Sequence, residues 1–186
     1  CVGTPDKGSG ETSLIAIESC AKTISDISSQ SVPVLIKSTV PVGTSVKIQY
    51  LINKGLKERK LDIKIPVASN PEFLREGGAI SAFYNPDRII LGTNDQEVIK
   101  VAYKLYKDLM PESQEILVMS PESSELTKYA SNAFLATKIS YMNEISQFCS
   151  ITGANIDDVR KGMGPDPSIS PGYLYAGCGF GGSCLP

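Results

Sequence analysis

The chain has 186 residues, of which 41% are hydrophobic and 20% are charged, and its formal net charge is −2. These values are typical of a globular protein that buries one core, or one and part of another, and they give no electrostatic reason to expect a nucleic acid or an anionic membrane as a partner. No apolar run is long enough to cross a bilayer, and the sequence has no histidine, which excludes Ser-His and Cys-His dyads and most zinc sites within these residues.

The cysteines indicate the redox compartment of the protein, and the chain ends indicate that the sequence is part of a longer one. Five cysteines occur, an odd number, and no two of them form a CxxC pair. This pattern argues against a disulfide framework and favours a reducing, cytoplasmic location. Because the first residue is Cys1 and the last four are Ser-Cys-Leu-Pro, we expect both ends to be cuts through a longer protein.

Strand-like and helix-like segments alternate along the first two thirds of the chain. In order, the pattern predicts a loop over 1–10, helices over 11–29, 45–59 and 96–110, and strands over 32–37, 61–69, 88–92 and 114–119. The glycines of the first loop form neither a dinucleotide fingerprint nor a P-loop, so by themselves they indicate a turn. The alternation predicts an α/β fold with a parallel sheet, in which ligands bind beyond the carboxyl ends of the strands. Thr39 and the loop 70–78 follow two such ends.

A long helix is predicted between Ser120, a suitable N-terminal cap, and Gly153, a suitable residue just past a helix end. Its apolar residues recur at three- and four-residue steps and form one stripe. The stripe contains Leu126, Tyr129, Ala133, Phe134, Thr137, Tyr141, Ile145 and Phe148. Such a helix usually joins domains or subunits. A short helix over 155–163 and an irregular loop from residue 164 follow it.

Several polar residues could carry chemistry, although each also has a purely structural interpretation. If the chain is helical after Pro71, Glu72 and Glu76 lie on one face, either as paired carboxylates or as a solvated turn. Lys128 and Asn132, four apart on the long helix, share a face that could be part of a site or only surface. The Thr39 hydroxyl could position a ligand or a water, or Thr39 could simply end a strand.

The segment from Gly179 to Cys184 surrounds a cysteine with small residues. Glycine N–H groups can approach an oxyanion closely, and an accessible thiolate is a good nucleophile. Without histidine, a fitting electrophile is an aldehyde, which a thiolate converts to a thiohemiacetal; hydride loss to a nicotinamide then gives a thioester. The alternative is an incidental cysteine in a tight turn.

Six motifs occur in order and at suitable spacing. They are Cys1-Val-Gly-Thr-Pro5, Ser38-Thr-Val-Pro-Val-Gly43, Asn70-Pro-Glu-Phe-Leu-Arg-Glu-Gly77, Asn85-Pro-Asp-Arg-Ile89, Lys128-x3-Asn132-Ala-Phe-Leu135 and Gly179-x-Gly-Gly-Ser-Cys184. Together they resemble the UDP-glucose/GDP-mannose dehydrogenase family of nucleotide-sugar 6-dehydrogenases, over essentially the whole chain.

The resemblance implies a particular domain organisation and reaction. Residues 1–120 would be the remainder of a Rossmann-like NAD-binding domain, and 121–186 a long central helix with a dimerisation and substrate-loop region. A second nucleotide-binding domain would be missing. The family oxidises C6 of a nucleotide sugar such as UDP-glucose from alcohol to carboxylate in two steps, with two NAD⁺, and forms a homodimer through the long helix.

The resemblance also implies roles for individual residues. Cys184 would be the nucleophile, Lys128 and Asn132 would stabilise the oxyanion, Thr39 would hold a water, and Glu72 would act as acid and base. The implied NAD contacts are Val2, Gly3, Thr4, Pro5, Thr39 and Glu76. The implied substrate contacts are Phe73, Leu74, Arg75, Lys128, Asn132, Tyr173 and Gly181.

The sequence departs from the family pattern in three places. The glycine-rich fingerprint upstream of Cys1 is absent, the chain ends at Pro186 before the usual Lys-Asp pair, and Ser168 stands where an Arg that reaches across the dimer is common. We therefore expect these 186 residues alone to be inactive.

The substrate branch stays open at this point. Residues 76–80 and 177–180 look more like the UDP-glucose branch, whereas Cys184-Leu-Pro186 is frequent in the GDP-mannose branch. A third alternative is a dimerisation module whose motifs are inherited but unused.

Overall fold

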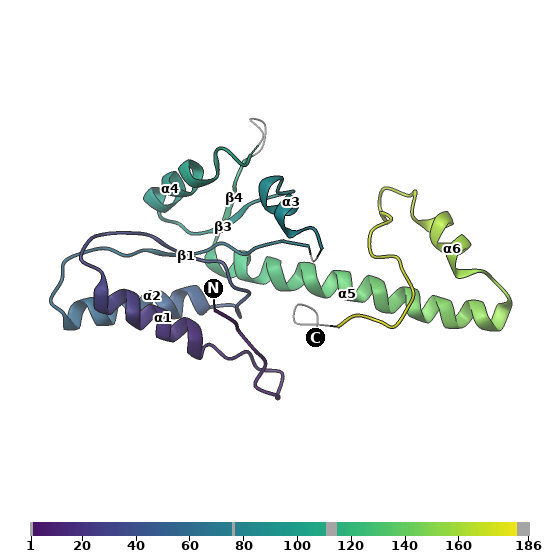
Figure 1. The fold of residues 1–186 in the computed structure, drawn as a ribbon, viewed down its shortest axis with the longest axis horizontal. Coiled ribbons are helices and arrows are strands. Elements are labelled where there is room, and N and C mark those ends of the chain that lie inside the picture. The colour runs from purple at the N-terminus through teal and green to yellow at the C-terminus, as the bar shows by residue number, and fades with distance from the viewer. Residues whose placement is uncertain (1, 76, 111–114, 182–186) are drawn as a thin grey trace. The chain divides into compact units, whose positions relative to one another are not determined.

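The computed structural model describes residues 2–75, 77–110 and 115–181. The elements are α1 (Ile15–Ile27), β1 (Val34–Ile36), α2 (Thr44–Glu58), β2 (Val67–Ser69), α3 (Ala79–Tyr84), β3 (Ile90–Gly92), α4 (Gln96–Tyr106), β4 (Leu117–Met119), α5 (Pro121–Thr152) and α6 (Ile156–Met163) (Figure 1). The chain divides into two compact units, residues 1–128 and 129–186. Each unit is described by itself below.

The first unit is built on a four-stranded sheet in the order β1-β2-β3-β4. β1 pairs with β2 and β3 pairs with β4 in parallel, as the alternating pattern predicts. The central pair, β2 and β3, is antiparallel. Among the described residues that connect them, helix α3 has six residues and buries none of them, so it does not cover the sheet as a crossover helix would. The predicted α/β class is confirmed, with a mostly parallel sheet.

Helices cover the two faces of this sheet, and each face has its own apolar core. Ile17 of α1 and Ile52 of α2 pack with Ile36 and Val67 on one face. On the other face α4 packs against Ala68 and residues of β3. Val67 and Ala68 are successive residues that belong to opposite cores, as the two-residue period of a strand requires. Figure 1 shows α1 and α2 side by side and α4 across the sheet from them.

The long helix begins and ends where its sequence signals predict. α5 has 32 residues. Before it, the Ser120 hydroxyl accepts a hydrogen bond from the Ser123 N–H at 3.2 Å, which is a capping interaction. After it, Gly153 has φ of 79°, a conformation that glycine adopts without strain, and its N–H donates to the Cys149 carbonyl.

The predicted apolar stripe of α5 is not its buried face within this chain. Phe134 and Phe148 are 64% and 62% exposed. Leu126, Tyr129 and Tyr141 are exposed as well. The buried residues of the helix are instead Ser124, Glu125, Lys128, Met142 and Cys149. The periodicity identified the helix correctly, but the stripe lies on its solvent side here.

In the second unit the irregular chain after α6 packs back onto α5. The Lys138 amine donates to the carbonyls of Ile169 and Ser170, at 3.0 and 3.2 Å. The Gly177 N–H donates to the Asn143 side chain at 2.8 Å, and Leu174 is buried. The loop is therefore irregular, as predicted, but held at several points.

Candidate functional site

The carboxyl end of β1 lies against the first residues of the chain. The Ser38 hydroxyl donates to the Val2 carbonyl at 3.1 Å, and the Thr4 hydroxyl donates to the Thr39 carbonyl at 2.9 Å. The structure thus brings together the predicted NAD contacts at Val2, Thr4 and Thr39. Pro5 and Gly3 are exposed, and nothing lies within 4 Å of where a Cβ would stand at Gly3.

The segment after the neighbouring strand supplies a carboxylate that pairs with a buried cation of α5. Asn70 directly follows β2, and Glu72 follows two residues later. The Glu72 carboxylate lies 3.1 Å from the Lys128 amine and also accepts the Leu74 N–H at 2.6 Å. The Lys128 side chain is 8% exposed and that of Glu72 is 31% exposed. Two predicted catalytic residues, 56 positions apart, therefore meet beyond the sheet.

The helix that would set Glu72 and Glu76 on one face is not formed over the described residues 71–75. Residues 71–75 have no regular secondary structure, because Pro71 and the Glu72 bond to the Leu74 N–H hold the segment as a turn rather than as a helix. Glu72 is instead placed by its ion pair with Lys128. Glu76 lies outside the described residues.

The predicted substrate contacts at 73–75 are packed among charged groups. Two cations lie near the Phe73 ring: the Arg88 guanidinium carbon is 4.0 Å from the ring centroid, and the Lys128 amine is 5.2 Å from it. Arg75 forms an exposed ion pair with Asp87. Leu74 is 44% exposed, so its side chain is available for contact.

Sequence reasoning missed Glu125, which is 2% exposed. Its carboxylate accepts the N–H groups of Gly43 and Ser45, at 2.6 and 2.7 Å, and the Ser45 hydroxyl at 2.7 Å. These donors form the first turn of α2, where the helix dipole favours a negative charge. Glu125 therefore fastens the loop that carries Thr39 to the helix that carries Lys128.

The second unit carries the remaining predicted site residues. Asn132 is half-buried on α5, four residues after Lys128. Tyr173 is 39% exposed and has φ of 65°, and Gly181 is exposed. Ser168 forms a local turn, because its N–H and hydroxyl both donate to the Asp166 carboxylate, which lowers the pKa of Asp166. Cys184 lies outside the described residues.

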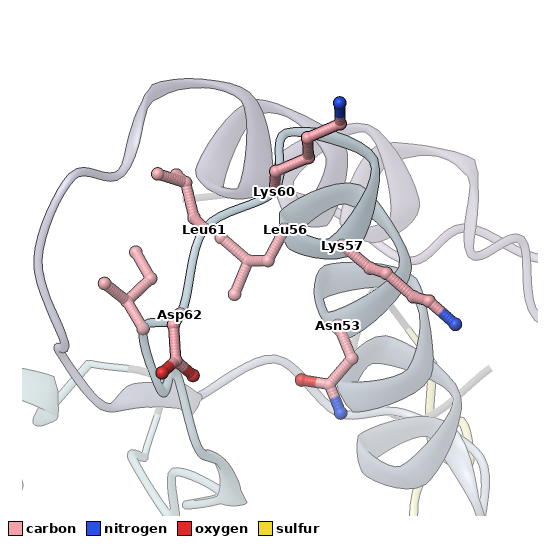
Figure 2. Close-up of a pocket in the computed structure, with 7 residues that line it drawn as sticks. Asn53, Leu56, Lys57, Lys60, Leu61 and Asp62 are labelled. Carbon is pink, nitrogen blue, oxygen red and sulfur yellow. The ribbon is translucent and has the colours of Figure 1, made fainter.

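A pocket away from these residues lies at the C-terminal end of α2, with a volume of about 390 Å³. Leu56 and Leu61 are among the residues that line it, and the amines of Lys57 and Lys60 point in different directions, away from the leucines (Figure 2). No predicted site residue lines it. Because the two lysine amines point in different directions, they cannot both donate to one ligand in this pocket.

The described part of the chain contains neither a membrane-spanning helix nor a cluster of metal-binding side chains. Over residues 2–75, 77–110 and 115–181, no helix is long and apolar enough to span a membrane. The same residues contain no group of three or more Cys, Asp or Glu side chains placed to hold a metal ion.

Family models match most of the chain. Residues 1–110 match the NAD binding domain of the UDP-glucose/GDP-mannose dehydrogenase family, and residues 122–186 match the central domain of the same family. The first match contains the first four of the six motifs, and the second match contains the last two.

Individual relatives match over the full chain. It is 43% identical over 185 residues to UDP-glucose 6-dehydrogenase of Pseudomonas aeruginosa and 46% identical over 185 residues to UDP-glucose 6-dehydrogenase YwqF of Bacillus subtilis. Each alignment covers 100% of this chain and 41% of the relative, so the chain spans about two fifths of the length of these relatives.

Solved structures share the fold. A UDP-glucose dehydrogenase from Pyrobaculum islandicum is 39% identical, with a TM-score of 0.89, over 100% of this chain and 42% of that one. A ternary complex of GDP-mannose dehydrogenase from Pseudomonas aeruginosa is 31% identical, with a TM-score of 0.81, over 100% of this chain and 43% of that one.

Proposed function

Because the chain belongs to the UDP-glucose/GDP-mannose dehydrogenase family, we propose that the whole protein oxidises UDP-glucose to UDP-glucuronate with NAD⁺. The observation that carries this proposal is the identity of 41–46% to proteins named UDP-glucose 6-dehydrogenase, over the full chain. The ion pair of Glu72 with Lys128 beyond the sheet adds support, because this is where α/β proteins bind ligands. The enzyme would act in the cytoplasm.

The residues near the N-terminus fit an NAD site. Val2 and Thr4 are bonded to the segment that contains Thr39, and the open space beside Gly3 lets a ligand approach the backbone. In the proposal the segment 2–5, Thr39 and Glu76 contact NAD. When bound, one NAD⁺ would accept the hydride that C6 of the sugar loses in each of the two oxidations.

The chain's own residues would carry the remaining chemistry. The Cys184 thiolate adds to the carbon of the C6 aldehyde and forms a thiohemiacetal, whose oxyanion Lys128 and Asn132 stabilise. Loss of hydride from this adduct leaves a thioester. Water held by Thr39 and activated by Glu72 attacks the thioester carbon, which releases the carboxylate and returns the proton to the thiolate or Glu72.

The charged amine of Lys128 is suited to stabilising the proposed oxyanion. The amine is buried, so an oxyanion beside it would interact in a poorly solvated environment, where electrostatic stabilisation is stronger than in water. The Glu72 carboxylate lies 3.1 Å from this amine and supplies its counter-charge.

The substrate would contact Phe73, Leu74 and Arg75 in the first unit and Tyr173 and Gly181 in the second. Proposed domain limits are 1–120 for the NAD-binding remainder and 121–186 for the long helix and dimerisation region. The exposed apolar stripe of α5 supports a homodimer through this helix, because such a stripe on a soluble protein marks an interaction surface.

A second candidate is oxidation of GDP-mannose. It is favoured by the terminal Cys184-Leu-Pro186 and by the similarity to the GDP-mannose dehydrogenase structure. A third alternative is a protein that is not an enzyme, namely a dimerisation module without activity.

Labelling of cysteines in the protein extended to the length of its relatives tests the nucleophile. We expect iodoacetamide to modify Cys184 faster than Cys20 and to abolish NADH production in parallel, and Cys184→Ser to lose the overall reaction. Cys20→Ser is the matched control and should retain activity. Equal reactivity of the two thiols, with full activity after Cys184 is modified, would contradict the proposal and favour the inactive module.

A further inference from the structure

A pocket of about 450 Å³ lies in the first unit, between the loop after β2, α3 and the end of α4. Its walls are mostly apolar and include Leu74, Phe83, Ile89 and Leu109. The volume falls within the range of small-molecule sites, roughly 300–1,000 Å³. Ser38, which donates to the Val2 carbonyl, also lines the pocket, as do Glu72 and Phe73.

Lys37 provides the polar end of this pocket. It follows β1 as Asn70 follows β2, and the register of these parallel strands sets the two residues side by side. The Lys37 amine donates to the side-chain oxygen (Oδ1) of Asn70 at 3.2 Å and to the Tyr106 hydroxyl at 3.3 Å. Asn70 is fully buried and is fixed in turn by its bond to the Ile90 carbonyl, at 2.8 Å. An ammonium has three N–H donors, and these bonds use two of them.

The charge of Lys37 is not neutralised by either hydrogen-bond partner, since Asn70 and Tyr106 are both neutral. The two acids that line the pocket have cations of their own: Glu72 pairs with Lys128, and Asp87 pairs with Arg75. Burial lowers the pKa of Lys37, while the Glu72 carboxylate acts in the opposite direction. A ligand anion beside the amine would supply the counter-charge that its neutral partners do not.

We propose that this pocket binds a small molecule with an aromatic or other apolar body and one anionic group, and that Lys37 binds the anion. The body lies against Leu74, Phe83 and Leu109, where apolar burial and ring contacts stabilise it. The pocket shares Glu72, Phe73 and Leu74 with the proposed dehydrogenase site, but Lys37 has no role in the proposed reaction, so the failure of one proposal leaves the other standing.

The test compares naphthoate with naphthamide, which has the same rings without the charge. The sequence contains no Trp, so naphthalene fluorescence can be followed without Trp emission from the protein. We expect naphthoate to bind at least about tenfold more tightly than naphthamide, the margin of a charge-assisted hydrogen bond. Lys37→Met should remove that preference and Lys37→Arg should retain most of it. The matched control is Lys60→Met in the pocket of Figure 2, which should leave both affinities unchanged.

Two further measurements keep the test decisive if Lys37→Met does not fold. Leu109→Phe should weaken both probes, because the larger ring fills the pocket. Naphthoate affinity should also fall as pH rises through the lowered pKa of Lys37, at a pH below that at which an ordinary lysine loses its proton. Glu72, Asp87, Arg88 and Tyr106 face the same pocket, so the Lys37→Arg variant, which stays charged, provides the reference pH profile. Equal affinity of wild-type protein for the two probes, or a preference for naphthoate that survives Lys37→Met, would overturn the proposal.

Discussion

At the scale of single residues, Glu125 does more for the candidate site than its position in a polar stretch of sequence indicates. Its carboxylate is buried and binds two N–H groups and a hydroxyl at the start of α2. Each donor would lose its partner if the side chain were shortened, and buried unsatisfied donors are costly. Glu125 thereby stabilises the connection between the Thr39 loop and α5.

Glu125→Ala should lower the free energy of unfolding by about 3 kcal/mol, because it leaves several buried donors unsatisfied. Urea unfolding followed by circular dichroism measures this loss. Glu122→Ala, on the exposed side of the same helical turn, is the control and should change stability little. Similar stabilities for the two variants would show that the Glu125 contacts contribute nothing.

Asp95 gives a pH-dependent contribution to stability. The hydrogen bond from Lys64 lowers the pKa of Asp95 below 3.8, and the N–H groups of Glu97 and Val98 act in the same direction at the start of α4. A lowered folded-state pKa means that the contribution is complete above the unfolded value and is lost as pH falls through the folded value. Asp95→Ala should therefore cost about 1 kcal/mol at neutral pH and less in acid. Asp95→Asn, which can still cap the helix, should cost less at neutral pH; a loss for Asp95→Ala that is constant with pH would contradict this.

At the scale of elements, the close approach of α5 to the sheet depends on Gly92. A Cβ there would lie 2.5 Å from the Ser124 Cβ and 2.9 Å from the Pro121 Cα. The proline carbon belongs to the backbone and cannot move alone. The Ser124 hydroxyl also donates to the Ser69 hydroxyl at 2.9 Å, so the helix start is held from two strands.

Gly92→Ala should destabilise the first unit by about 2 kcal/mol through overpacking. Gly162→Ala in α6 is the matched control: nothing lies within 4 Å of its Cβ position, so alanine should be neutral or stabilising in that helix. Thermal unfolding of both variants measures the difference. Equal melting temperatures for Gly92→Ala and the unchanged protein would contradict the close packing.

Local sequence patterns predicted the helices and strands well. Contacts between residues far apart in the sequence explain features that these patterns did not predict. Ser120 and Gly153 mark the ends of α5 because a cap and a positive φ are local requirements. The antiparallel β2–β3 pair depends on contacts between distant residues, which periodicity does not contain, whereas the turn after Pro71 is held locally by the Glu72 bond to the Leu74 N–H. Glu125 could not be distinguished from other helical glutamates, since its partners lie 80 or more residues away.

At the scale of the whole molecule, the proposed site is divided along the chain. Thr39, Glu72 and Lys128 belong to the first unit, and Asn132 belongs to the second. The two family matches divide the chain in a similar place, at 1–110 and 122–186. Among the described residues, the ion pair of Glu72 with Lys128 is a direct contact between two residues that were predicted for one catalytic site.

The most direct test of the central proposal is NADH formation by the protein extended to the length of its relatives, with UDP-glucose and with GDP-mannose. We predict that UDP-glucose yields UDP-glucuronate and two NADH per sugar, that GDP-mannose is a much poorer substrate, and that the 186-residue chain alone yields none. NADH formation with GDP-mannose but not with UDP-glucose, or with neither sugar, would contradict the proposed function.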